Sequence, residues 1–169
     1  LMEKKKEKEK SSAGKNDYGI VIDGVNNTLI RFARCCTPLP GDEITGYVTK
    51  LTGITVHRKD CKNVQSMIAH DPTREIAVAW DKSLIAKKLN KYKFTFNVLV
   101  YDRPNILLDL MNVIANHKIN LVSVNSNEIT KNGDKYINLK LTIEISDKSE
   151  YKYLLNNLLK LKSVISVDR

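Results

Sequence analysis

Residues 137–145 have the sequence INLKLTIEI, in which aliphatic and polar side chains alternate without a break. Successive side chains of a β-strand point to opposite faces, so this segment predicts a strand with one face in a core and the other facing water or a partner. Asn132-Gly133-Asp134, shortly before it, predicts a hairpin turn. The turn would pair this strand with the apolar segment at residues 121–128.

Two more strands and two helices are predicted around this hairpin. Residues 94–101 alternate in the same manner, and residues 163–168 form a short last strand. A helix is predicted from about Asn105, because apolar residues recur there at helical spacing. Its predicted buried stripe consists of Leu107, Leu110, Met111 and Ile114.

The second helix begins with a capping box, in which Asp147 is followed three residues later by Glu150. Its predicted buried stripe consists of Tyr151, Leu154, Leu155 and Leu158. The order β-α-β-β-α-β over residues 92–169 predicts a ferredoxin-like fold of the α+β class, with two helices on one face of a four-stranded antiparallel sheet.

The sequence before residue 92 divides into three parts. Residues 1–17 are a low-complexity Lys/Glu stretch that ends in small polar residues, which predicts a solvated linker. Residues 18–80 predict a small β-rich unit, and residues 81–91 a charged linker. The elements predicted in the unit are strands at 19–22, 29–33, 46–49, 54–57 and 75–80, a turn at 26–27 and a helix at 63–69. About 60 residues bury little apolar surface, so a structural metal or docking against a neighbour would help this unit to fold.

All three cysteines lie in one loop-rich segment between residues 35 and 63. Cys35 and Cys36 are adjacent, and His57 and Cys61 follow after a stretch rich in Pro and Gly that would fold the segment back on itself. Three thiolates and one imidazole suit a closed tetrahedral zinc site. Neighbouring residues of an extended strand point to opposite faces, so both cysteines can reach one ion only if the backbone turns sharply between them.

Other uses of these cysteines stay open. An odd number of cysteines does not form a disulfide framework. Small thiols often fill a tight turn as ordinary buried residues. A catalytic Cys–His pair is a further alternative, although no acidic residue or oxyanion-binding frame accompanies it in the sequence.

The same segment and its flanks carry basic and aromatic side chains that suit contact with RNA. Basic groups would hold phosphates while rings stack on exposed bases. The candidates are Arg31, Arg34, Tyr47, Lys50, His57, Arg58, Lys59 and Lys62. The alternative is a solvated polar face, since Asp42, Glu43 and Asp60 interrupt the patch.

A second candidate site lies where the first strand of the C-terminal unit meets its first helix. Helix-start N–H groups beside Asp102, Arg103 and Asn105 can receive the carboxylate of a small ligand. The alternative is that Asp102 or Asn105 only caps the helix.

Charge and hydropathy limit the classes of partner. The net charge of +9 is compatible with a polyanionic partner. Residues 18–80 hold seven basic and six acidic residues, and residues 92–169 hold eleven basic and eight acidic residues, so neither unit is strongly basic. No run approaches the roughly 18 apolar residues that span a bilayer, and the N-terminus is charged where a signal peptide is apolar. We therefore expect a cytoplasmic location without membrane contact.

Three motifs together resemble the regulatory end of RelA/SpoT-type stringent-response proteins, the bifunctional (p)ppGpp synthetase/hydrolases. The first is Asp23-Gly24, and the second is CCTPLPGDEITGYVTKLTGITVHRKDCKNV, which begins at Cys35. The third is an ACT-type half that contains YDRPNILLDL and INLVSVNS. The resemblance covers residues 18–169, although Asn105 stands where ACT domains usually have Gly.

This resemblance implies two regulatory, non-catalytic domains. Residues 18–80 would form a conserved-cysteine, zinc-finger-like domain with its ligands at Cys35, Cys36, His57 and Cys61, and residues 92–169 an ACT domain. The GTP pyrophosphokinase and ppGpp hydrolase activities would belong to upstream catalytic domains, which this region would control while it contacts ribosomal RNA and tRNA.

The alternative function is amino-acid sensing by an ACT dimer that binds its ligand at the loop from Asp102 to Asn105. Exposed edges of the ACT sheet predict that such a homodimer forms through this domain.

Overall fold

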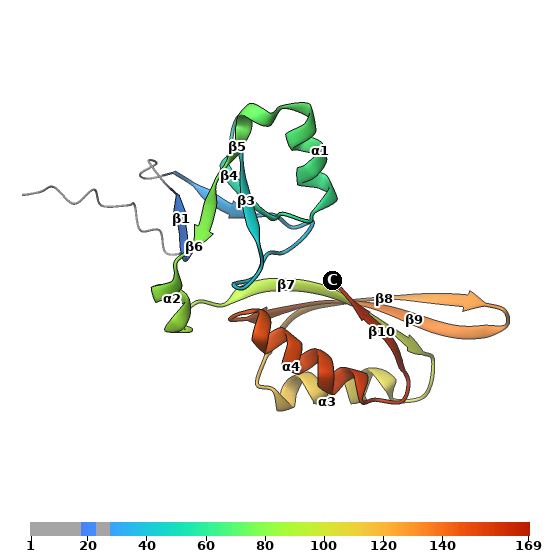
Figure 1. The fold of residues 1–169 in the computed structure, drawn as a ribbon. Helices are drawn as coiled ribbons and strands as arrows, with labels where there is room; N and C mark the ends of the chain where they lie inside the picture. Colours follow the sequence, from blue (N-terminus) through green and yellow to red (C-terminus); the bar gives the residue numbers. More distant parts are fainter. Residues whose placement is uncertain (1–17, 23–27) are drawn as a thin grey trace, which may run out of the picture.

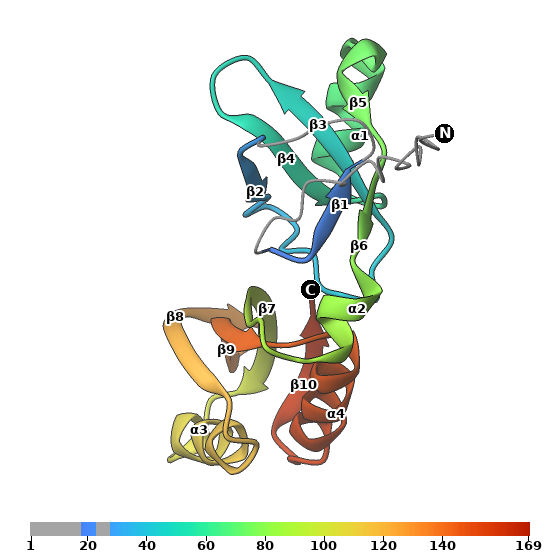
Figure 2. The ribbon, with the colours of Figure 1, turned by 90° about the vertical axis from the view of Figure 1, so that its left-hand side faces the viewer.

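The computed structural model describes residues 18–22 and 28–169 and contains two α+β units, one stacked on the other (Figure 1, Figure 2). The predictions for the segment 1–17, the turn at 26–27 and the Asp23-Gly24 motif lie outside the described residues. The C-terminal end of the chain lies close to the junction of the two units (Figure 2).

The C-terminal unit has the predicted order β-α-β-β-α-β. Its elements are β7 (Tyr92–Tyr101), α3 (Ile106–Asn116), β8 (Asn120–Lys131), β9 (Asp134–Ile145), α4 (Lys148–Leu159) and β10 (Val164–Asp168). The strands form one antiparallel sheet in the order β10-β7-β9-β8. Both helices cover the same face of this sheet (Figure 1). The predicted ferredoxin-like fold is therefore confirmed.

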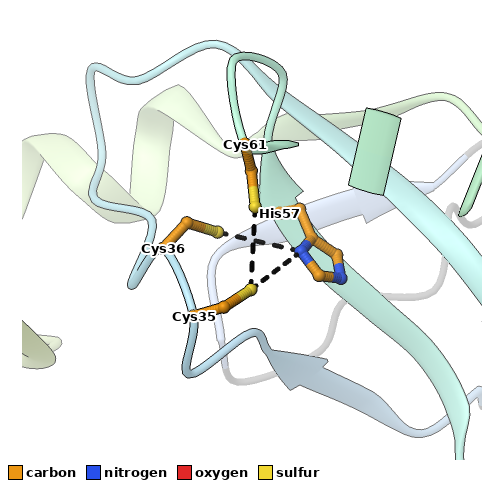
Figure 3. A group of neighbouring side chains, drawn as sticks. All are labelled: Cys35, Cys36, His57 and Cys61. Carbon is orange, nitrogen blue, oxygen red and sulfur yellow. Dashed lines mark hydrogen bonds between the residues drawn. The ribbon is translucent and has the colours of Figure 1, made fainter. Parts of the chain in front are cut away.

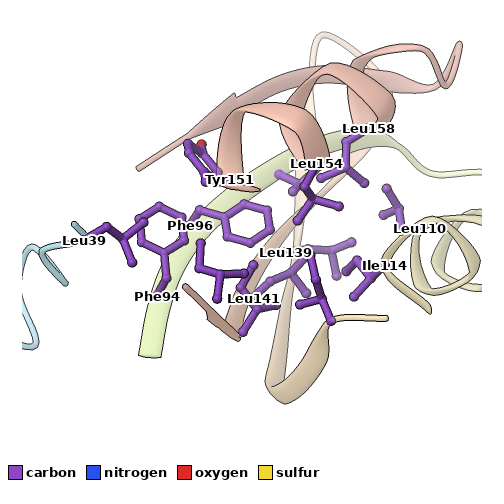
Figure 4. Close-up of a cluster of buried hydrophobic side chains, with 14 of the residues drawn as sticks. Leu39, Phe94, Phe96, Leu110, Ile114, Leu139, Leu141, Tyr151, Leu154 and Leu158 are labelled. Atoms are coloured by element: carbon purple, nitrogen blue, oxygen red, sulfur yellow. The ribbon is translucent and has the colours of Figure 1, made fainter. Parts of the chain in front are cut away.

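The core of this unit lies between the sheet and the two helices. The alternation of residues 137–145 places Leu139, Leu141, Ile143 and Ile145 on the buried face of β9, opposite the buried phenylalanines and valines of β7. Helices α3 and α4 bury their apolar stripes against this face (Figure 4). The predicted stripe of α4 is confirmed, with Leu155 partly buried and the other three residues fully buried.

The predicted stripe of α3 is wrong at one position. Leu107 is 46% exposed, whereas Ile106 is 3% exposed. The helix begins at Ile106, and the line of residues i, i+4, i+8 through Leu110 and Ile114 faces the sheet. Leu107 lies about 100° further around the helix, on its solvent side.

Local signals predicted the turn and the cap correctly. Asn132 and Gly133 both have positive φ, at 53° and 83°, as a two-residue type I′ hairpin requires. The side chain of Asp147 accepts a hydrogen bond from the backbone N–H of Glu150 at 2.9 Å. The return bond of the capping box differs, because the Glu150 carboxylate accepts from the N–H of Ser146, the residue before the cap, at 2.7 Å.

The N-terminal unit is built from short strands and one α-helix, followed by a short helix in the connection. Its elements are β1 (Ile20–Ile22), β2 (Ile30–Phe32), β3 (Ile44–Thr49), β4 (Gly53–Arg58), α1 (Lys62–His70), the 3-10 turn η1 (Pro72–Arg74), β5 (Glu75–Ile76) and β6 (Val78–Trp80), with α2 (Lys82–Ala86) after them. A four-stranded sheet has the order β2-β4-β3-β5, and β1 pairs with β6 in a separate ribbon. The predicted hairpin and helix are confirmed as β3–β4 and α1.

Two sequence predictions need correction in this unit. The single strand predicted at 75–80 is divided at Ala77, because β5 pairs with β3 whereas β6 turns away to pair with β1. The segment predicted as a linker contains α2, which begins where the Asp81 side chain accepts from the N–H groups of Ser83 and Leu84. That helix is five residues long, too short for a periodic apolar signal.

Residues 37–42, which we call the docking loop, belong to the N-terminal unit and pack against the C-terminal unit. Leu39 in this loop is fully buried in the core of the C-terminal unit, where Figure 4 shows it beside Phe94. The N–H of Thr95 in β7 donates to the Thr37 hydroxyl at 3.2 Å. The N-terminal unit therefore contributes a residue to the core of its neighbour.

Strand β8 lies at one edge of the C-terminal sheet, and its outer side pairs with no other described strand. An unpaired edge of this kind can pair with a second copy of the chain. Homodimer formation through the ACT-like unit stays a prediction. Within the described residues, no helix is long and apolar enough to cross a membrane.

Replacement of Gly53 by alanine should destabilise the chain far more than replacement of Gly133. Both glycines have φ near 80°, so both variants carry the strain of a left-handed backbone, about 1 kcal/mol. A Cβ at Gly53 would also lie 2.2 Å from the Leu29 carbonyl oxygen, whereas a Cβ at Gly133 would meet nothing within 4 Å. We expect Gly53→Ala to cost at least about 3 kcal/mol in urea unfolding. Equal losses in the two variants would contradict this account.

Candidate functional site

The four predicted metal ligands come from three separate elements of the N-terminal unit. Cys35 and Cys36 follow β2, His57 lies near the end of β4, and Cys61 precedes α1. Strand β2 runs parallel to β4, with Phe32 opposite Val56, so the chain that leaves β2 reaches the side of His57. One ligand atom from each of the four residues lies within 4.8 Å of the others (Figure 3).

A tight turn allows the two adjacent cysteines to reach the same point. The N–H of Thr37 donates to the carbonyl of Ala33 at 3.0 Å, which closes one turn of chain around Cys35 and Cys36. Thr37 itself has φ 37°, in the left-handed region that β-branched residues rarely adopt. The sharp turn that the adjacent cysteines require is therefore present.

Three separations between ligand atoms of the cluster fit the edges of a tetrahedral zinc site. The Cys35 Sγ lies 3.6 Å from the Cys61 Sγ and 3.5 Å from the His57 Nδ1, and the Cys36 Sγ lies 3.8 Å from the same Nδ1. A tetrahedron with metal–sulfur distances of about 2.3 Å and metal–nitrogen distances of about 2.0 Å has edges of about 3.5 to 3.8 Å. These four residues can hold a metal ion.

The electrostatics of the cluster differ from ligand to ligand. Burial, together with the neighbouring Cys35 and Cys61, raises the pKa of the Cys36 thiol to about 12, although the Arg58 N–H donates to its sulfur at 3.3 Å. Burial opposes the charge of Cys61, but the Val64 N–H at the start of α1 and other hydrogen bonds hold the pKa of this thiol below its ordinary value. A bound cation would favour the thiolate at both positions.

His57 is suited to be a neutral ligand. Its side chain is 4% exposed, and burial lowers the pKa of the imidazole below its ordinary value. The neutral ring presents Nδ1 to the sulfur atoms of Cys35 and Cys36 (Figure 3). Metal ligation by histidine requires this neutral form.

The predicted RNA-binding residues separate into exposed and buried groups. Five basic residues are exposed, namely Arg31, Arg34, Lys50, Lys59 and Lys62. Tyr47 is 6% exposed, and its hydroxyl lies 3.4 Å from the Met67 carbonyl, to which it donates. Tyr47 and His57 therefore offer no free ring face for stacking. Arg58 is half-buried, and its Nε lies 3.5 Å from the Asp60 carboxylate.

The predicted ligand-binding loop of the C-terminal unit is held by internal contacts. Arg103 donates to the Ser163 hydroxyl, to the Pro104 carbonyl at 3.0 Å and to Asp109 at 2.7 Å. Asp102 and Asn105 are exposed. Asn105 has φ 63°, in the left-handed backbone region that favours glycine, and its side chain makes no cap bond to α3. The guanidinium of Arg103 is already engaged by the protein itself.

The structural importance of Asp42 is not predicted by its sequence context. Its carboxylate is buried in the docking loop and accepts from Arg169 at 2.7 and 2.8 Å and from the Leu39 N–H at 2.8 Å. Lys148 lies 3.6 Å away. Asp42 is thus a junction between the two units rather than an interruption of a surface patch.

Comparison with known proteins assigns both units. Residues 20–81 match the family model of the RelA/SpoT RIS domain, and residues 88–169 match an ACT domain model. The chain is 34% identical over 155 residues to a GTP pyrophosphokinase of Escherichia coli K12 and 34% identical over 154 residues to one of Myxococcus xanthus. It is 32% identical over 154 residues to the bifunctional (p)ppGpp synthase/hydrolase RelA of Mycobacterium tuberculosis.

These matches cover 91–92% of this chain but only 19–20% of the relatives. The chain therefore spans about a fifth of the length of the curated relatives it matches. Among solved structures, the ACT domain from GTP pyrophosphokinase of Chlorobium tepidum aligns with 47% of this chain and 99% of its own length, with a TM-score of 0.40 and 19% identity.

Proposed function

The chain belongs to the RelA/SpoT family, as a regulatory region made of a RIS domain and an ACT domain, and from this premise we propose that it contacts ribosomal RNA and tRNA and controls catalytic domains of its parent protein. The parent would be a (p)ppGpp synthetase/hydrolase in the cytoplasm. The two regulatory domains themselves are non-catalytic.

The observation that supports RNA contact is a group of free cations beside the cysteine cluster. Lys59 and Lys62 flank Cys61 in sequence, both are exposed, and neither forms an ion pair with any described residue. Free ammonium groups at one end of a rigid turn suit the phosphates of a folded RNA. Arg31, Arg34 and Lys50 supply further exposed positive charge on the same unit.

Reversal of charge at Lys59 and Lys62 should reduce association with ribosomes. We expect the double variant Lys59→Glu, Lys62→Glu to bind at least about tenfold more weakly in a pelleting assay at low salt, because two phosphate contacts would become repulsive. The matched control is Lys152→Glu, Lys160→Glu, which reverses one exposed charge on α4 and one at its C-cap. Equal loss in both variants, or no loss in the first, would contradict the RNA proposal.

We also propose that the cluster of Cys35, Cys36, His57 and Cys61 holds zinc. Three thiolates and one imidazole form a typical structural zinc set, and four protein ligands leave no open position for a substrate. The ion would link β2, β4 and α1 in a unit with a small core of its own.

The zinc proposal predicts a defined metal content. Protein purified without chelator should contain about one zinc ion per chain, because the donor set is complete within one unit. Elemental analysis of the purified chain measures this content. If the purified chain contains no metal, the zinc proposal is wrong and the cysteines only pack the turn.

Control of catalytic domains would require the two regulatory domains to act together. The docking loop supports this, since Leu39 enters the ACT core and Asp42 binds Arg169 at the end of β10. A change at the RIS surface would therefore reach the ACT domain through direct contacts.

A further inference from the structure

A cavity of about 550 Å³ lies at the junction of the two domains, on the far side of the turn that carries Cys35 and Cys36. One wall comes from the RIS domain, with Phe32, Ala33, Arg34 and Pro38 among its residues. The other wall comes from residues 89–93, which lead into β7. The metal site and the proposed RNA contact at Lys59 and Lys62 use none of these residues.

The floor of the cavity is apolar, and its rings pack against one another. Ala33, Pro38 and Tyr92 are buried, and Phe32 is half-buried. The Phe32 ring stacks on Trp80, with centroids 5.8 Å apart, and forms T-shaped pairs with Tyr92 at 5.5 Å and with Tyr18 at 6.2 Å. The Tyr92 hydroxyl also donates to the Tyr18 carbonyl at 2.8 Å. Aromatic rings fixed in this way offer a preformed surface for a flat apolar group.

The rim of the cavity is cationic. Arg34 and Lys93 are exposed, and neither has an ion-pair partner within the described part of the chain. Lys91 differs, because it donates to the Ser146 hydroxyl at 2.9 Å and lies 3.8 Å from Glu150. None of the described residues that line the cavity is an aspartate or a glutamate. The positive charge of the rim therefore attracts an anionic group, and no carboxylate among the described lining residues repels it.

We propose that this cavity binds a small anion that carries a flat ring, such as a nucleoside monophosphate or an aromatic carboxylate. The ring lies against Phe32 and Pro38, and the anionic group meets Arg34 and Lys93. The cavity has the volume of a small-molecule site, and a guanidinium pairs with both phosphate and carboxylate. Such a ligand touches both domains at once, so its binding favours the docked arrangement. This site shares Arg34 with the basic residues named for RNA contact, but it uses neither Lys59 nor Lys62, on which the RNA test depends.

Calorimetry with the 169-residue chain tests the proposal. The probes are adenosine 5′-monophosphate, adenosine, indole-3-acetate and inorganic phosphate. We expect saturable binding of adenosine 5′-monophosphate or indole-3-acetate with a Kd below about 1 mM, and weaker binding of both adenosine and phosphate. Preference for the first probe would identify a nucleotide site, and preference for the second a carboxylate site.

The decisive variant is Arg34→Ala, Lys93→Ala, which should weaken binding at least about tenfold while the melting temperature stays unchanged, since both side chains are exposed. The matched control Lys152→Ala, Lys160→Ala should bind as the wild type does. The proposal is overturned if neither ring-bearing anion binds, if adenosine or phosphate alone binds equally well, or if the decisive variant keeps wild-type affinity. Since Lys59 and Lys62 do not line the cavity, the RNA proposal and this one can fail separately.

Discussion

Replacement of His57 by alanine is expected to abolish metal binding and to destabilise the RIS domain far more than the ACT domain. The imidazole is buried and supplies the one nitrogen of the four-ligand set. Structural zinc in small domains contributes about 10–16 kcal/mol of apparent binding free energy, and loss of one ligand removes several kcal/mol of it. Within the described part of the RIS domain, the main apolar cluster has six buried residues. The apolar core of this domain is too small to compensate for the loss of several kcal/mol of metal-binding free energy.

Elemental analysis and thermal unfolding measure the two parts of this prediction. We expect less than about a tenth of the wild-type zinc content and a separate RIS transition at least about 10 °C below the single midpoint of the wild type, since 1 kcal/mol shifts the midpoint of a domain this small by several degrees. His70→Ala is the matched control, because His70 is the exposed last residue of α1. That variant should keep both its zinc and its melting temperature.

Cys36→Ser separates ligation from packing. Serine preserves the small buried side chain but is a poor zinc ligand, so the metal hypothesis predicts a loss similar to that of His57→Ala. If the cysteines only fill a tight turn, the cost should be about 1 kcal/mol and independent of zinc. Wild-type stability in Cys36→Ser, together with a metal-free wild type, would refute the zinc site.

Local sequence patterns predicted the ACT domain well. Its strands alternate over residues 94–101 and 137–145, and its turn and helix cap each depend on residues within four positions of one another. Such short-range signals are visible without knowledge of the tertiary structure. The prediction for Leu107 was wrong because helical spacing shows how often buried residues recur. It does not show whether Ile106 or Leu107 is the first buried residue of the helix.

The RIS domain was harder to predict, because its strands are short and their pairing is not local. Nothing near Ala77 indicates that β5 and β6 join different sheets. The identity of the candidate metal ligands followed from residue type, yet their convergence depends on the parallel pairing of β2 with β4 and on the left-handed backbone at Thr37. Neither feature has a signature in the sequence.

Asp42 is the clearest example of a contact that depends on residues far apart in the sequence. An aspartate after Pro-Gly is typical of an exposed turn, and in the sequence Asp42 is one of several acidic residues near the basic ones. Its partner, Arg169, is 127 positions away in the chain. A pairing of that kind becomes visible only when both domains are folded and docked.

Asp42→Asn is therefore expected to destabilise the docked pair of domains by about 3 kcal/mol. The substitution keeps the volume of the side chain but leaves the Arg169 guanidinium, which also lies 4.7 Å from the Phe94 ring centroid, without its counter-charge. Removal of one partner of a buried ion pair commonly costs about 3–5 kcal/mol, and asparagine can still accept one of the hydrogen bonds. Glu43→Gln, at the exposed neighbouring position, should change stability by less than about 0.5 kcal/mol.

Urea unfolding followed by the fluorescence of Trp80 measures this difference. The indole N–H of Trp80 donates to the Asp42 carbonyl at 3.1 Å, so the probe lies at the junction. We expect Asp42→Asn to lower the midpoint and to separate one transition into two, because each domain would then unfold without its neighbour.

The pH dependence of this difference tests its electrostatic origin. Burial opposes the charge of Asp42, but hydrogen bonds from Arg169 and the Leu39 N–H hold the pKa of its carboxyl below the ordinary value of 3.8. A carboxyl with a lower pKa in the folded state stabilises the fold above its unfolded pKa, and this contribution is lost as the pH falls through the folded pKa. The gap between wild type and Asp42→Asn should therefore be largest near neutral pH and should narrow below about pH 4. A gap that is equally large at about pH 3 would show that shape rather than charge holds the docking loop in place.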